Sequence, residues 1–133
     1  MKCELCESDG GARIWHDERC RVVLVDEPGY PGFCRVIWNT HVKEMTDLVD
    51  AERGQLMRVV FALETALREL LHPDKVNLAS LGNATPHLHW HVIPRFRDDP
   101  HFPNPIWGAS IRRPAAGSGA TIKQALAERL SRL

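Results

Sequence analysis

His87-Leu88-His89-Trp90-His91 is the most regular stretch of this sequence, because three of the chain's seven histidines alternate there with apolar residues. Side chains of a β-strand point alternately to its two faces, so a strand here would place the three imidazoles on one face, about 7 Å apart. The intervening apolar residues would share the other face. We therefore predict a strand from His87 to Arg95, with its apolar face against a helix and its histidine face in a cleft.

The residues before this strand contain further short segments of strand character. Runs rich in β-branched and aromatic residues, separated by turn-forming residues, predict strands at residues 13–17, 21–26, 33–38 and 76–81. A Pro-Gly turn at Pro31-Gly32 leads into the third of these runs. The sequence therefore predicts about five strands in all.

One long helix is predicted between the third and fourth strands, from Asp50 to His72. Its inner face is formed by apolar residues three or four positions apart, namely Leu56, Val60, Leu63, Leu67 and Leu70. Asp50 is a suitable N-cap residue, and Pro73 disfavours helical geometry at His72. Strands and a single long helix in this order indicate an α+β fold.

The chain changes character after Arg95, where proline, glycine and charged residues become frequent. This arm carries Trp107, which we expect to pack at the edge of the site or of a dimer rather than to contact a base. Thr121 can cap a last helix whose apolar side carries Ile122, Leu126, Leu130 and Leu133. We predict one domain over residues 1–110 and a C-terminal extension over residues 111–133 with a short helix.

Composition favours a small-molecule substrate. The 133 residues include 17 Lys plus Arg and 17 Asp plus Glu, so no overall positive charge attracts a nucleic acid polymer or an anionic membrane. The chain has no secretory signal and no apolar run of the roughly 20 residues that cross a bilayer. We expect a cytoplasmic protein, whose four cysteines are reduced thiols or metal ligands rather than disulfides.

Aligned imidazoles are suited to attack on a phosphate group. Imidazole is partly neutral near pH 7 and can expose one nitrogen while the other is held by a hydrogen bond. A second histidine can donate a hydrogen bond to the phosphate, and the turn at Gly82-Asn83 can add backbone amide donors. The same pattern is also typical of a metal site, or of a strand with one polar face.

The run from His87 to Arg95, with Val92-Ile93-Pro94 before the arginine, resembles the signature of the histidine triad family, including its common Pro-Arg ending. The resemblance extends over about Cys3 to Trp107. It implies an α+β unit with an antiparallel sheet, a long helix and a C-terminal arm or helix. It further implies a nucleotide hydrolase or transferase that forms a covalent nucleotidyl-histidine at His89. His91 would contact the phosphate, and His87 would support the nucleophile or a metal.

The resemblance also implies substrate contacts and a homodimer. Asp26 corresponds to the acidic or amide residue that contacts the ribose, and Asn83, next to Gly82, lies in the loop that contacts the phosphate. Family members pair through the helix and one strand. Many of them carry a fourth histidine after the Pro-Gly turn, where this chain has Phe33. Orientation of the nucleophile would then depend on a backbone carbonyl, on His87 or on no group.

A structural zinc site is predicted around the N-terminus. Cys3 and Cys6 have the C-x2-C spacing of a zinc knuckle, which supplies half of a tetrahedral site. In the histidine triad family and the related hexose-phosphate uridylyltransferases, such a pair can be completed by histidines at the positions of His41 and His87. The ion would orient His87 and would not be required for the chemistry. The other reading is two free thiols on a mobile terminus.

Together these features predict an enzyme that cleaves at the α-phosphate of a nucleotide, with dinucleoside polyphosphates such as diadenosine tetraphosphate as the favoured substrates and nucleoside phosphoramidates next. One alternative is a nucleotidyltransferase that uses a phosphorylated acceptor. Another is a zinc-containing protein that binds nucleotides with little turnover, an alternative that Phe33 keeps open.

Overall fold

The computed structural model describes residues 2–115 and 122–133. Its strands are β1 (Ala12–His16), β2 (Cys20–Leu24), β3 (Cys34–Trp38), β4 (Lys75–Ala79) and β5 (His89–Arg95). Its helices are α1 (Glu4–Glu7), the 3₁₀ turn η1 (Met45–Asp47), α2 (Asp50–Leu71) and α3 (Ile122–Leu130). The five predicted strands are therefore present, with ends shifted by one or two residues.

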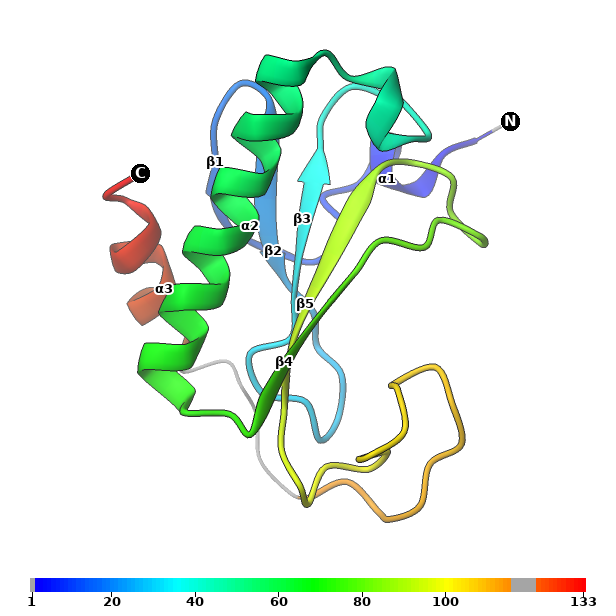
Figure 1. Cartoon of the computed structure of the whole chain (residues 1–133), viewed down its shortest axis with the longest axis vertical. Helices are drawn as coiled ribbons and strands as arrows, with labels where there is room; N and C mark the ends of the chain where they lie inside the picture. Colours follow the sequence, from blue (N-terminus) through cyan, green and yellow to red (C-terminus); the bar gives the residue numbers. More distant parts are fainter. Residues whose placement is uncertain (1, 116–121) are drawn as a thin grey trace.

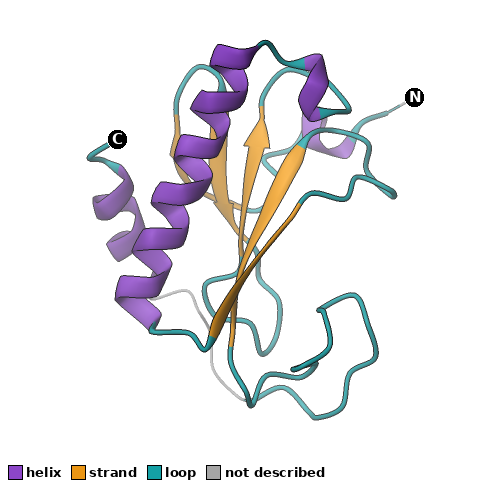
Figure 2. Cartoon of the chain, in the orientation of Figure 1, coloured by secondary structure: helices purple, strands orange, loops and turns teal. Residues whose placement is uncertain are grey.

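The strands form one antiparallel sheet in the order β1-β2-β3-β5-β4. Helices α2 and α3 lie against one face of this sheet, and the arm that follows β5 forms an irregular loop at one end (Figures 1 and 2). The opposite face of the sheet receives the N-terminal segment and the histidines. The predicted α+β fold is confirmed.

Helix α2 packs its apolar face into the main hydrophobic cluster. Leu56, Val60, Leu63 and Leu67 are fully buried against the strands, as their spacing predicts, and Leu70 is half-buried. The chain leaves the helix at His72, whose φ of 49° is left-handed and whose successor is Pro73. The N-terminus differs from the prediction, because Asp50 is the first helical residue and Val49 is the N-cap.

The N-terminal cap of α2 comes from a residue inside the helix. The Val49 N–H donates a hydrogen bond of 3.1 Å to the carboxylate of Glu52. The prediction that Asp50 caps the helix is wrong, because Asp50 is the first helical residue. The N-cap residue Val49 has no side-chain acceptor, and the Glu52 carboxylate satisfies one of the free amides instead.

The Pro-Gly turn before β3 needs glycine. Gly32 has a φ of +81°, and a Cβ atom there would lie 2.5 Å from Cδ1 of Leu71 at the end of α2. The turn therefore packs closely on the end of the helix, and Phe33, the next residue, is buried against Tyr30 and Ile93.

The C-terminal helix packs on the same core. Ile122, Leu126 and Leu130 of α3 belong to the main hydrophobic cluster, whereas Leu133 lies beyond the helix and is exposed. The predicted N-cap, Thr121, lies outside the described residues, and the domain boundary at residue 110 stays a prediction. No helix in the two described segments has the length and apolar composition to cross a membrane.

The histidine run is only partly a strand. β5 begins at His89, because the N–H of His87 donates to the carbonyl oxygen of Thr85 in the preceding turn, at 2.8 Å. Leu88 still packs in the helix-facing core with Val92, with Trp90 partly buried against it, as the alternation predicts. The prediction of three histidines on one strand is therefore wrong for His87, and its imidazole joins a different group of side chains.

Candidate functional site

His89 is held in one orientation by the backbone of its own strand. Its Nδ1 lies 2.5 Å from the carbonyl oxygen of His87, so this nitrogen carries the proton and donates it. The Ser80 hydroxyl donates to the carbonyl oxygen of His89 at 2.7 Å and fixes the strand from the β4 side. These contacts leave the lone pair of Nε2 as the end of the ring that can meet a ligand.

Burial favours the neutral form of His89. Desolvation lowers the pKa of His89, the hydrogen bond to the His87 carbonyl opposes this shift, and the guanidinium of Arg35 lowers the pKa further. Only 7% of the residue is exposed. A buried, neutral imidazole with one fixed proton has the protonation state required of a nucleophile.

His91 lies beside His89 on the same face of β5. The ring centroids are 4.9 Å apart, and the ring of Trp107 also packs on His91, at 4.9 Å between centroids. Burial, then His89 and Arg35, lowers the pKa of His91 to about 4. Its Nδ1 is buried without a hydrogen-bond partner among the described residues, so Nε2 is the end that can reach a ligand.

Phe33 stands where the family resemblance places a fourth histidine. It is buried, its ring is 5.8 Å from that of His91, and the guanidinium of Arg35 lies 6.0 Å from its centroid. Phe33 therefore packs on His91, and its side chain cannot donate a hydrogen bond. Of the three alternatives for orienting His89, the structure shows the backbone carbonyl of His87.

Cys3, Cys6, His41 and His87 form one cluster on the N-terminal side of the sheet. Their potential ligand atoms all lie within 4.8 Å of one another. Sγ of Cys3 is 3.3 Å from Nδ1 of His87, and Sγ of Cys6 is 3.5 Å from the Nδ1 atoms of both histidines. The two Nδ1 atoms are 3.2 Å apart. Segments far apart in the sequence thus bring the four predicted residues together.

The geometry of this cluster fits a tetrahedral metal ion. Zinc with bonds of about 2.0–2.3 Å keeps its nitrogen and sulfur ligands roughly 3.3–3.8 Å apart, close to the separations seen. The tautomer of His87 also fits, because its Nε2 donates to the carbonyl oxygen of Trp38 at 2.6 Å and so leaves Nδ1 as a lone pair facing the cysteines. His87 therefore links the cluster to His89, because its ring contacts the cysteines and its carbonyl oxygen accepts the hydrogen bond from His89.

Two of the three residues that were predicted to contact the substrate are exposed. Asp26 is exposed just after β2, and Asn83 is exposed in the turn between β4 and His87. Gly82 precedes it with a φ of +76°, a conformation suited to glycine. Their contacts with a substrate stay predictions.

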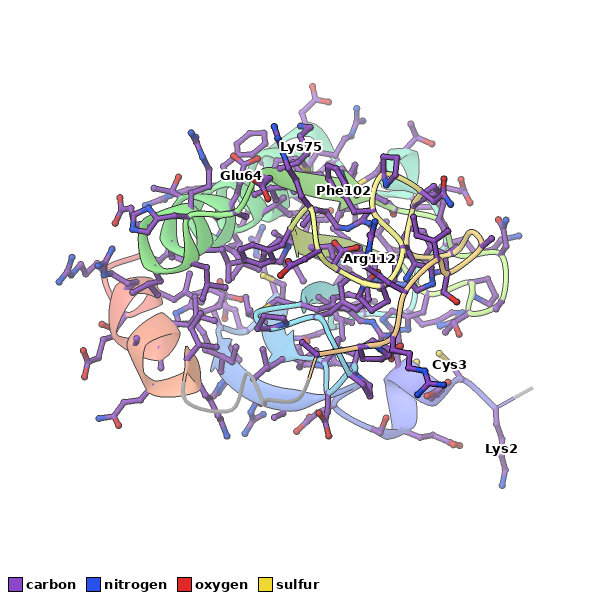
Figure 3. All side chains as sticks on the ribbon, turned by 90° about the horizontal axis from the view of Figure 1, so that it is seen from below. Lys2, Cys3, Glu64, Lys75, Phe102 and Arg112 are labelled. Carbon is purple, nitrogen blue, oxygen red and sulfur yellow. The ribbon has the colours of Figure 1, made fainter. Side chains whose placement is uncertain are left out.

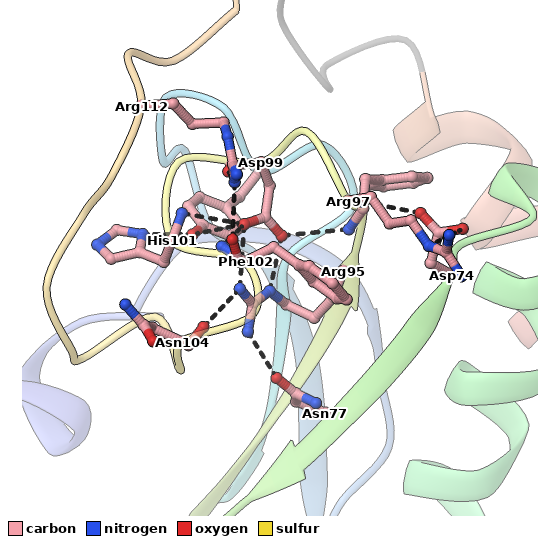
Figure 4. A network of polar contacts seen from close by, with 11 residues as sticks. Asp74, Asn77, Arg95, Arg97, Asp99, His101, Phe102, Asn104 and Arg112 are labelled. Carbon is pink, nitrogen blue, oxygen red and sulfur yellow. Dashed lines mark hydrogen bonds and ion pairs between the residues drawn. The ribbon is translucent and has the colours of Figure 1, made fainter.

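A buried ion pair that the sequence did not reveal holds the arm. Arg95 and Asp99 are 2% and 3% exposed, with Nε and Oδ2 2.7 Å apart (Figure 4). Arg95 also donates to Asn77 on β4 and to the carbonyl oxygen of Asn104 in the arm. The only sequence signal was the Pro-Arg ending of the motif, because Asp99 resembles any loop acid.

The aspartate organises the turn that follows β5. Its carboxylate accepts backbone N–H bonds from Phe96, His101 and Phe102 at 2.7–3.1 Å. Burial opposes ionisation, but the Arg95 pair and these amides outweigh it and lower the pKa of Asp99 to about 2. The arm that carries Trp107 thus starts from a rigid, charged anchor.

Comparison with known families agrees with this geometry. A family model described as the HIT domain matches residues 10–98, which include both strand histidines and the turn before β3. The chain belongs to the histidine triad family.

Similar histidine triad proteins cover most or all of this chain. A histidine triad protein from Marinobacter aquaeolei VT8 is 27% identical with a TM-score of 0.81, covering 100% of this chain and 97% of that one. A Zn-bound histidine triad family protein from Mycobacterium smegmatis is 25% identical with a TM-score of 0.69, over 99% and 95%.

A curated relative shares only part of its length with this histidine triad chain. The AP-4-A phosphorylase of Mycobacterium tuberculosis is 29% identical over 90 residues, which is 63% of this chain and 46% of that protein. The chain spans about half the length of the curated relatives it matches.

Proposed function

We propose that this histidine triad protein cleaves dinucleoside polyphosphates at the α-phosphate through a covalent nucleotidyl-His89 intermediate. The observation that carries the proposal is the His89 Nδ1–His87 carbonyl hydrogen bond of 2.5 Å, which leaves Nε2 unprotonated beside His91. Diadenosine tetraphosphate is the favoured substrate, and nucleoside phosphoramidates are next.

The first step exchanges a phosphorus–oxygen bond for a phosphorus–nitrogen bond. Nε2 of His89 attacks the α-phosphorus, the bond to the bridging oxygen breaks, and the leaving nucleotide departs with that electron pair as a polyphosphate anion. The imidazole becomes positively charged, and the His87 carbonyl stabilises this charge through the Nδ1 proton. Neutral His91 donates from Nε2 to a phosphate oxygen.

The second step returns the enzyme to its starting state. A water molecule attacks the same phosphorus, the phosphorus–nitrogen bond breaks, and its electron pair returns to Nε2 of His89. The water gives up one proton to solvent, and the products from diadenosine tetraphosphate are AMP and ATP. The positive imidazole is a good leaving group, which is why covalent catalysis through histidine is fast in both steps.

A second candidate differs only in the acceptor. The name of the curated relative, AP-4-A phosphorylase, favours inorganic phosphate in place of water. Attack of phosphate on nucleotidyl-His89 would give ADP and ATP. The intermediate and the role of His89 are the same in both reactions.

Product analysis separates these reactions. The protein is incubated with diadenosine tetraphosphate, with and without inorganic phosphate, and the nucleotides are resolved by chromatography. AMP plus ATP in both samples supports hydrolysis, whereas ADP plus ATP only with phosphate supports phosphorolysis. Binding of the substrate without either product set would contradict the proposed activity and favour a binding protein.

We further propose that Cys3, Cys6, His41 and His87 hold a zinc ion. Zinc would act there as a structural cross-link between the N-terminus and the strand that carries His89. The tetrahedral separations and the His87 tautomer support the assignment, as does the zinc bound by the Mycobacterium smegmatis relative. His87 would then keep its carbonyl in place for the nucleophile.

The zinc proposal predicts a stoichiometric metal. We expect about one zinc ion per purified chain by elemental analysis, and loss of that zinc in the Cys3→Ser, Cys6→Ser double variant, because hydroxyls are poor zinc ligands. Tm should fall in the double variant. The control is Cys20→Ala, whose buried thiol has a pKa raised to about 12 and lies outside the cluster. Equal zinc in parent and double variant would contradict the site.

A homodimer is also proposed, through β4 and α2. β4 lies at one end of the sheet, and Phe61 of α2 is 53% exposed. A groove of about 620 Å³ follows this edge, where Glu64 of α2 and Lys75 of β4 lie side by side (Figure 3). A second copy would extend the sheet and cover the exposed ring.

The dimer predicts the effect of a charge at Phe61. Phe61→Glu should convert the dimer to a monomer in light scattering, because it would bury a charge in the proposed interface. The control, Val49→Asp, removes another exposed apolar residue at the N-cap of the same helix and should remain dimeric. A monomeric parent would contradict the proposal.

A further inference from the structure

Trp107 is an exposed aromatic residue whose ring contacts His91. The residue is 51% exposed, although its ring packs on His91 with an interplanar angle of 66°. An apolar ring of this size that stays half in solvent beside a reactive centre is a candidate contact for a ligand.

The backbone around Trp107 is fixed before any ligand binds. The Gly108 N–H donates to the Pro105 carbonyl oxygen at 2.9 Å and closes a turn across the tryptophan. The Asn104 side chain donates to the Ala109 carbonyl oxygen at 3.1 Å, and the Asn104 carbonyl accepts from Arg95 at 2.8 Å. Preceding Trp107, Ile106 packs on the cluster of Tyr30, Phe33 and Ile93. The indole is therefore presented at little entropic cost.

The base of the arm is anchored on the same network. Arg112 donates to the carbonyl oxygens of Asp99 and Phe102 at 2.7 Å and 2.8 Å, so both ends of the arm meet at the buried ion pair (Figure 4). These bonds hold the loop around Trp107 without using its ring. The ring itself contacts His91 and also lines the groove along β4, so the leaving part of a substrate and the dimer partner are the two ligands that its exposed part could meet.

The histidine that is proposed to hold the phosphate contacts both of the other rings. The ring centroid of His91 lies 4.9 Å from that of His89 and 4.9 Å from that of Trp107. An in-line displacement places the nucleophile and the leaving group on opposite sides of phosphorus. With phosphorus next to His89 and a phosphate oxygen on His91, the leaving group departs on the side of phosphorus away from His89, and Trp107 is the exposed aromatic ring that contacts His91.

We propose that Trp107 is the stacking platform for the aromatic base of the leaving nucleotide, and so selects substrates with a second nucleoside. This inference rests on the proposed function. Every nucleobase has a flat π-face, so stacking gives affinity for a dinucleoside substrate without choosing between bases. Trp107 touches no reacting atom and contributes through the position of the leaving group.

Two substrates with the same transferred nucleotide test this role. The leaving group from diadenosine tetraphosphate is ATP, a purine nucleotide, whereas the leaving group from adenosine 5′-phosphoramidate is ammonia. Both substrates give the same adenylyl-His89. We expect Trp107→Ala to lower the ratio of their kcat/KM values by about 5- to 150-fold, the range for losing one base–aromatic stack. Trp107→Phe, which keeps a ring, should recover most of the ratio.

The controls distinguish the platform from its rivals. Ile111→Ala removes another exposed apolar residue of the arm, 53% exposed, and should leave the ratio within twofold of the parent. An unchanged ratio in Trp107→Ala, with both substrates affected equally or with the dimer dissociated, would overturn the platform. A parent that cleaves neither substrate would overturn the proposed function, and the platform with it.

Discussion

Replacing His89 with alanine is expected to lower kcat/KM for diadenosine tetraphosphate by at least about 10⁴-fold, the scale on which enzymes lose activity when a covalent nucleophile is removed. The reason is that no other group replaces Nε2 in the bond-forming step. The His87 carbonyl and His91 would still be present, but they can only stabilise charge on a phosphate that is not attacked.

Mass spectrometry of acid-quenched protein adds a direct readout. The parent should gain the mass of one adenylyl group on His89, and His89→Ala should gain none. His91→Ala should slow the labelling without preventing it, because His91 is proposed to donate a hydrogen bond rather than to form a bond to phosphorus. His16→Ala, at an exposed position on β1, is the matched control. Turnover by His89→Ala at the parent's rate would rule out the nucleophile.

Asp99→Asn is expected to cost about 3–5 kcal/mol in the free energy of unfolding and to lower Tm by about 10–20 °C. The substitution leaves Arg95 buried without its counter-charge and weakens the acceptor for three backbone amides. Since small domains are stable by only about 5–15 kcal/mol, this is a large share of the total. Urea unfolding followed by circular dichroism measures it.

The stability difference between the parent and Asp99→Asn should also depend on pH. The pKa of Asp99 is depressed to about 2 in the folded chain, below about 3.9 in an unfolded one. Its ionic contribution is therefore complete above about pH 4 and is lost as the pH falls toward 2, amounting to about 2.5 kcal/mol. The difference in stability between parent and Asp99→Asn should accordingly narrow from pH 5 to pH 2.5.

The neighbouring aspartate is the control for this measurement. Asp98 is exposed, and Asp98→Asn should change the stability by no more than about 0.5 kcal/mol. A similar loss in both variants, or a difference between parent and Asp99→Asn that stays constant down to pH 2.5, would show that the buried pair does not stabilise the arm.

Local patterns were sufficient for the elements of the fold. The spacing of Leu56, Val60, Leu63 and Leu67 predicts the buried face of α2, and Pro73 predicts where that helix ends. The Pro-Gly turn predicts the start of β3 within a residue. These features depend on neighbours a few positions away, so the sequence contains them directly.

Contacts between distant segments could not be read in this way. The alternation predicted His87 beside His89 on one strand, but a hydrogen bond to Thr85 ends the strand before it. The prediction that His41 and His87 join the two cysteines rested on the family resemblance and not on their spacing in the sequence. For Asp99 nothing in the sequence distinguished a buried partner of Arg95 from a surface acid.

The sequence by itself therefore determined the strands, the long helix, and the two histidines that share a face of β5, because each follows from a short repeating pattern. The tertiary structure decided which groups complete the site. It gives the carbonyl of His87 to His89, the ring of His87 to the cysteine cluster, and Trp107 to His91. Such pairings depend on how the sheet, the N-terminus and the arm pack together, and that is set by burial and hydrogen bonding across the whole chain.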